Sequence, residues 1–138
     1  MNASALPVIR VVIDRTGALL VQAELAATPS SRRRGLLGRD GLASGSGMLI
    51  RPCSSVHTCF MRFPIDVVFL DRDGLVRRIV ARMVPWRLAR GGGLAWQTLE
   101  LPAGAGAAAG LREGDRLVCE EPLRAHSHTR RTSSRQAP

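Results

Sequence analysis

The feature that most constrains this chain is a series of short apolar runs, each bounded by residues that favour turns. Residues 18–25 alternate between apolar and polar side chains, which is typical of a half-buried strand. Residues 65–70 are apolar on both faces except for Asp66, which predicts a central strand. Asp and Gly at 14–17 and at 71–74 predict hairpin turns. About seven such strands predict a mainly β fold, a small single-domain structure like a sandwich or barrel.

One short helix interrupts this pattern, and we expect it near residues 30–38. Thr28 offers an N-cap hydroxyl, and Pro29 suits the first helical position. Arg32 and its two arginine neighbours span less than one turn, so they should fan outward. They form either a solvated face or an anion contact.

The length of 138 residues suits one domain, and we place it at residues 1–123. Residues 124–138 carry four arginines and no acid, which predicts a disordered basic tail. No apolar run approaches the roughly 18 residues of a membrane span. The N-terminus shows no export signal, so we expect a cytoplasmic protein.

The charge is strongly positive, and its carriers are unusual. All 20 basic residues are arginine, and the formal net charge is +9. A basic chain can bind nucleic acid or other polyanions, weakly and without specificity, through its arginines and tail. The five aromatic residues offer few stacking platforms for single strands.

Three blocks of sequence point to a known family. They are residues 28–42, residues 56–71, and Leu99 to Gly104 followed by Gly114-Asp115. In order and spacing they resemble the prokaryotic family called domain of unknown function 192, over residues 8–120. The resemblance implies a small, mainly β sandwich with a short helix. It implies no established activity, and many members of that family begin with an export signal.

The loop 53–66 is the candidate site, because an unpatterned loop of this length is often functional. If residues 56–63 are extended, then His57, Cys59 and Met61 share one face. Such a soft set could bind Cu(I), but it could equally be core packing. We predict no cofactor and no metal, with Cys53, His57 and Cys59 as the residues to test.

Asp66 must find a partner if its strand is central, because a buried carboxylate needs hydrogen bonds or an opposite charge. We expect it in a polar network with His57 or an arginine of residues 30–40. Its alternative role is structural, in an ion pair or on loop N–H groups.

The sequence therefore favours a non-catalytic accessory protein that binds a small ligand or a protein partner at residues 53–66. One alternative is a small enzyme that uses His57 and Asp66 with a Cys nucleophile or metal ligand. Another is nonspecific polyanion binding. The candidate ligand-binding residues are Arg32, Arg39, His57, Thr58, Met61, Asp66 and Glu100.

Overall fold

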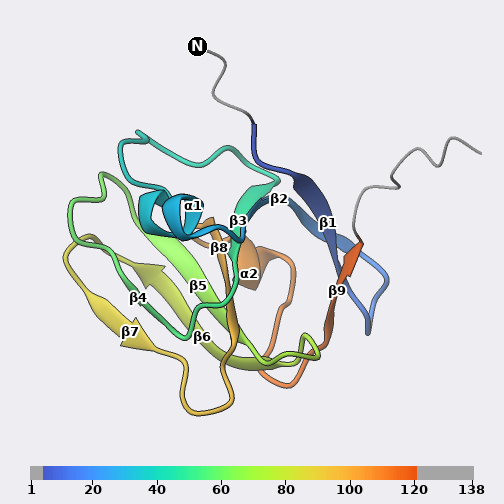
Figure 1. The fold of residues 1–138 in the computed structure, drawn as a ribbon. Coiled ribbons are helices and arrows are strands. Elements are labelled where there is room, and N and C mark those ends of the chain that lie inside the picture. The colour runs from blue at the N-terminus through green and yellow to red at the C-terminus, as the bar shows by residue number, and fades with distance from the viewer. Residues whose placement is uncertain (1–4, 121–138) are drawn as a thin grey trace, which may run out of the picture.

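One curled sheet of seven strands makes up most of the computed structural model, which describes residues 5–120 (Figure 1). Its strand order is β6-β5-β8-β3-β2-β1-β9, and only the β2–β3 pair is parallel. The strands are β1 (Val8–Ile13), β2 (Leu19–Ala26), β3 (Ser46–Ile50), β5 (Ile65–Leu70), β6 (Val76–Met83), β8 (Gln97–Pro102) and β9 (Leu117–Glu120).

The two edges of the sheet meet, so the sheet closes part of a barrel. A β-bridge joins Leu75, next to β6, to Arg116, next to β9. The Val76 N–H donates to the Asp115 carbonyl at 2.8 Å, and the Leu117 N–H donates to the Gly74 carbonyl at 2.8 Å. The prediction of a mainly β, barrel-like fold is confirmed.

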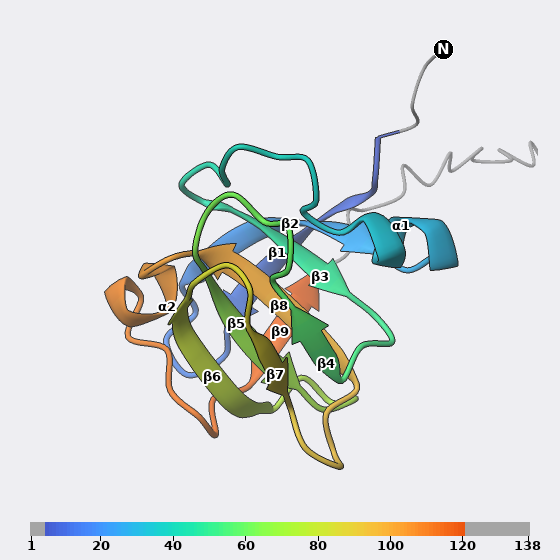
Figure 2. The same cartoon turned by 90° about the vertical axis from the view of Figure 1, so that its left-hand side faces the viewer.

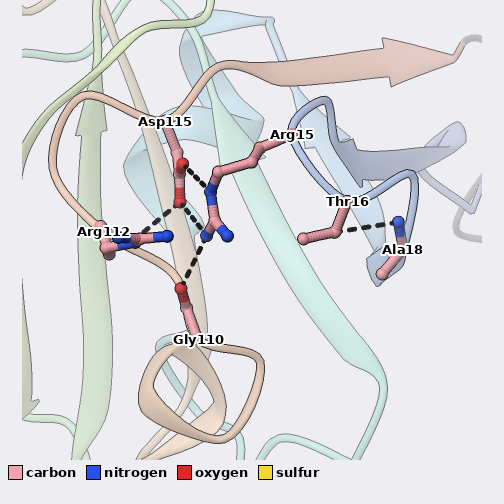
Figure 3. Close-up of polar contacts among 6 residues, drawn as sticks. All are labelled: Arg15, Thr16, Ala18, Gly110, Arg112 and Asp115. Carbon is pink, nitrogen blue, oxygen red and sulfur yellow. Dashed lines mark hydrogen bonds and ion pairs between the residues drawn. The ribbon is translucent and has the colours of Figure 1, made fainter.

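An ion pair holds the turn before β9 against the β1–β2 hairpin (Figure 3). The Arg15 guanidinium donates to Asp115 at 2.8 and 3.1 Å, and to the Gly110 carbonyl at 3.0 Å. The Arg112 N–H donates to the same carboxylate at 2.9 Å. Arginine therefore lowers the pKa of Asp115 to about 2, and the contact ties two distant turns together.

The central strands are buried on both faces because two separate apolar clusters cover them. The inner cluster fills the curl of the sheet and draws on all seven strands. The outer cluster lies on the other face, where Met48, Val67 and Phe69 pack against covering segments. All six residues of β5 are buried, which confirms the central strand.

A two-stranded ribbon supplies much of that cover. It pairs β4 (Ser55–His57) with β7 (Leu88–Arg90), and Val56 and Ala89 point into the outer cluster. Residues 84–93 contain β7, although Pro85 and the glycines at 91–93 give this segment no strand pattern in the sequence. Residues 56–63 are not extended throughout, because β4 ends at His57 and Phe60 turns the chain with a φ of 67°. The condition under which His57, Cys59 and Met61 would share one face is therefore not met.

Two short helices lie well apart in the fold (Figure 2). Helix α1 (Pro29–Arg34) begins as predicted, with Thr28 and Ser31 in a capping box and Pro29 in the first turn. It ends earlier than expected, because Gly35 leaves the helix with a φ of 46°. Helix α2 (Ala105–Ala108) follows β8.

No helix within residues 5–120 is long and apolar enough to cross a membrane. The tail predicted at residues 124–138 lies outside the described residues.

Candidate functional site

A pocket of about 620 Å³ opens between α1, the ribbon strand β4 and the outer face of the sheet. Three segments line it: residues 29 and 32–37, residues 50, 52–57 and 61, and residues 95, 96 and 100. It lies above the outer cluster, since Leu36, Ile50, Val56 and Met61 belong to both. Its size falls within the roughly 300–1,000 Å³ of ligand-binding pockets.

Glu100 lines this pocket from the sheet. It lies opposite Met48 and Val67 in the strand register, so its side chain is on the outer face. The residue is 6% exposed, and its Oε2 atom has no hydrogen-bond partner within residues 5–120. Burial raises the pKa of Glu100 to about 7, against the opposing effect of the Arg39 charge.

Three consecutive arginines of α1 line the pocket on the other side. Arg33 and Arg34 are exposed, whereas Arg32 is partly buried. An Arg32 amino group donates to the Pro52 carbonyl at 3.4 Å, but its buried Nε has no partner in the part of the chain that the structure describes. The pocket therefore holds one unused donor and one unused acceptor among its buried polar atoms, an arrangement that suits a polar ligand.

Cys53 is fixed in the wall by its backbone. Its N–H donates to the Trp96 carbonyl at 2.8 Å, and its carbonyl accepts from the Thr98 hydroxyl at 3.0 Å. The Cys53 thiol donates to the Ser55 carbonyl at 3.3 Å. Burial raises the pKa of Cys53, which favours the thiol over the reactive thiolate.

His57 and Met61 also line the pocket, as do Arg32 and Glu100. His57 is exposed at the end of β4, and Met61 is 9% exposed within the outer cluster. The structure therefore brings together four of the seven candidate ligand-binding residues.

Asp66 lies elsewhere. It is opposite Leu101 of the inner cluster, so its side chain is on the face of the sheet away from the pocket. Its Oδ1 accepts the N–H groups of Arg82 and Gly104 at 2.8 and 3.0 Å, and its Oδ2 accepts that of Gly106 at 2.9 Å. The expected network with His57 or an arginine of residues 30–40 is wrong. The alternative, a carboxylate on loop N–H groups, describes its contacts.

The other candidates are also outside the pocket lining. Arg39 pairs with Glu24 at 2.5 Å and acts on Glu100 through its charge alone. Thr58 is fully buried and bonded to the loop at residues 84–87. Cys59 does not join Cys53 and His57, because no three His, Cys, Asp or Glu side chains within residues 5–120 could hold a metal ion together.

Sequence reasoning missed the part of the pocket that comes from far along the chain. Ala95 and Trp96 line it next to Cys53 because the backbone pairs the two segments. No periodicity or spacing signals that pairing. Arg33 and Arg34 could have been found, since an anion contact was one interpretation of the arginine run.

Comparisons with known proteins agree with this fold. Residues 11–119 match the model of the family DUF192, which is described as an uncharacterised ACR. A crystal structure from Sinorhizobium meliloti, named as a candidate transcription regulator, is 28% identical with a TM-score of 0.75 over 86% of this chain and 98% of that one. A protein of unknown function from Novosphingobium aromaticivorans is 25% identical, also with a TM-score of 0.75, over 86% of this chain and 89% of that one. No curated protein matches the chain.

Proposed function

Because the chain belongs to the DUF192 family, whose description assigns no activity, we propose its function from the pocket itself: a non-catalytic domain that binds a small polar ligand. The observation that carries this proposal is the Oε2 of Glu100, which is buried in the pocket wall and has no partner among residues 5–120. A buried carboxyl oxygen without a partner is destabilising, and a ligand that hydrogen-bonds to it removes that cost.

The chemistry of the lining indicates the class of ligand. Arginines 32–34 suit a carboxylate or phosphate group, because guanidinium groups bind such anions through paired hydrogen bonds. Glu100 requires a second group on the ligand, such as a hydroxyl, an amide or an ammonium. A small carboxylate with such a group, for example a hydroxy acid or an amino acid, meets both requirements.

Two features support binding over nucleophilic catalysis. Both carboxylate oxygens of Asp66 are engaged by backbone N–H groups on the opposite face, so Asp66 is not available to orient His57. Cys53 is held as a thiol by its burial. A Cys/His pair needs an activated thiolate and an oriented base.

The test is to identify a ligand and then remove its contact. Native mass spectrometry of the full chain would report any molecule that co-purifies. Calorimetry with a panel of hydroxy acids, amino acids and simple carboxylates would give the affinity. We expect E100Q to weaken binding of the best ligand by about tenfold, the loss of one hydrogen bond to a charged group.

Glu24 provides a matched control, since its carboxylate also neighbours Arg39 but does not line the pocket. E24Q should leave the affinity unchanged. Equal losses in E24Q and E100Q, or a panel in which nothing binds and nothing co-purifies, would overturn the proposal.

A further inference from the structure

Four apolar side chains are exposed at the end of the ribbon, and we call them the aromatic patch. Phe60 is 72% exposed, Val84 46%, Trp86 58% and Leu88 65%. The rings of Phe60 and Trp86 pack with centroids 4.7 Å apart at 59°. None of the four lines the pocket described above. The patch is therefore a separate surface.

Thr58 holds the two loops of the patch together. Its hydroxyl donates to the Val84 carbonyl at 2.7 Å and accepts from the Arg87 N–H at 3.0 Å. Its N–H donates to the Arg87 carbonyl at 2.9 Å, and its carbonyl accepts from the Trp86 N–H at 3.1 Å. Thr58 is fully buried, so the exposed side chains stand on a rigid base.

The backbone is also bent to display these rings. Phe60 has a φ of 67° and Trp86 a φ of 66°, in the left-handed region that bulky residues avoid. Such strain persists only where neighbouring contacts enforce it, and it concentrates at functional sites. Exposed aromatic side chains on a strained, clamped loop are a feature of binding surfaces.

The segment that carries Val84, Trp86 and Leu88 has charges of one sign only. Between Asp73 and Glu100 the chain carries five arginines and no acid, and all five are exposed: Arg77, Arg78, Arg82, Arg87 and Arg90. One guanidinium, that of Arg87, bonds to the Trp86 carbonyl at 3.3 Å, directly beside the patch. An anionic partner complements this segment.

We propose that the aromatic patch inserts into the interface of a bilayer that contains anionic lipids. Phe and Trp suit the boundary between headgroups and acyl chains, and flanking arginines attract acidic headgroups. Val84 and Leu88 favour lipid over single-stranded nucleic acid, because aliphatic side chains provide no surface on which bases stack. This inference does not depend on the pocket or its ligand.

The test uses the full chain with vesicles of phosphatidylcholine alone, or of equal parts phosphatidylcholine and phosphatidylglycerol. The chain has two tryptophans, so W96F leaves Trp86 as the only reporter. We expect the fluorescence of W96F to shift to shorter wavelength with the anionic vesicles and not with the neutral ones. W86A and L88S should each sediment with anionic vesicles roughly tenfold more weakly.

Leu94 supplies the matched control, because it is 61% exposed and lies outside the patch. L94S should bind as the parent chain does, and circular dichroism melts would confirm that each variant folds. If W86A and L88S keep full vesicle binding, arginines elsewhere are responsible and the patch plays no part. An unshifted Trp86 spectrum, or a shift that appears only with a single-stranded oligonucleotide, would also overturn the proposal.

Discussion

Two buried carboxyl groups on neighbouring strands, Asp66 and Glu100, have opposite surroundings. Asp66 faces the inner cluster and accepts three backbone N–H groups. Glu100 faces the outer cluster, and its Oε2 has no partner among the described residues. Burial is similar, at 1% and 6% exposure, so burial alone does not separate a structural acid from a site acid. The hydrogen-bond donors around each carboxyl group separate the two roles, because they decide whether the protein itself satisfies its oxygen atoms.

The largest expected effect is at Asp66. D66A should lower the free energy of unfolding by about 3–5 kcal/mol, because it leaves three N–H groups without their acceptor. D66N should also be destabilised, since its amide presents hydrogens to one set of N–H donors. Denaturant melts measure both variants.

The exposed Asp40, which pairs with Arg62 on the surface, is the control for this measurement. D40A should cost less than about 0.5 kcal/mol. A small loss in D66A would break the comparison, because Asp66 would then be no more structural than a surface acid.

Removing the carboxylate of Glu100 should stabilise the fold at neutral pH, whereas removing that of Asp66 should destabilise it. Its pKa is raised from the ordinary 4.5 to about 7, so between these values the folded state binds more protons than the unfolded state. Stability contributed by this group is therefore lost as the pH rises from about 4.5 to about 7. A charged, partly unsatisfied Glu100 destabilises the fold at neutral pH.

E100Q should remove that pH dependence. Relative to the parent chain, the free energy of unfolding of the variant should rise by about 3 kcal/mol between pH 4 and pH 8, the size that the shift in pKa implies. Denaturant melts at the two pH values measure the gain, and a given concentration of ligand should stabilise the variant less than it stabilises the parent chain. A difference between the two chains that is the same at both pH values would contradict the prediction.

The fold was largely predictable, and the reason is local. Three features depend only on residues that are adjacent in sequence: the apolar run at residues 65–70, the Asp-Gly turns and the Thr28-Pro29 start of α1. The parallel pairing of β2 with β3 and the meeting of the sheet edges are not, because they depend on contacts between distant segments. The same limit hid the role of residues 95–96 in the pocket.

The site was predictable only in part. Alternation places Asp66 and Val67 on opposite faces, but it does not say on which face the loop 53–66 folds back. The loop covers the face of Val67, and this brings His57 and Met61 to Glu100 and leaves Asp66 behind. Proximity in sequence suggested the wrong partner for Asp66.

Asp115 is intermediate between Asp66 and Glu100, since the charged side chain of Arg15 at the surface hydrogen-bonds to it (Figure 3). Its pKa is lowered from 3.8 to about 2, so its stabilising effect is present above the ordinary value and is lost as the pH falls through about 2. D115N should cost about 1–2 kcal/mol at neutral pH. Acid titration of unfolding should show this difference vanish toward pH 2; a difference that persists there would assign it to packing.

The smallest effect concerns Arg39, whose charge is the one influence that lowers the pKa of Glu100. Arg39 also pairs with Glu24, and both side chains are more than a third exposed, so solvent screens the interaction. R39Q should raise the pKa of Glu100 above about 7 by less than one unit. Carbon-13 NMR of the Glu side-chain carboxyls follows the titration directly, with R90Q as a control for the loss of one exposed positive charge.

This last measurement tests whether Glu100 is tuned by its surroundings or only by its burial. If R39Q raises the pKa and R90Q does not, the Arg39–Glu24 pair helps to keep Glu100 partly ionised at neutral pH. Its carboxyl group can then either accept or donate a hydrogen bond to a ligand, which Asp66 with its three N–H donors has no need to do. If neither variant changes the pKa of Glu100, burial in the outer cluster accounts for the whole rise of that pKa. A ligand that hydrogen-bonds to Glu100 then has only the desolvation of this carboxyl group to offset.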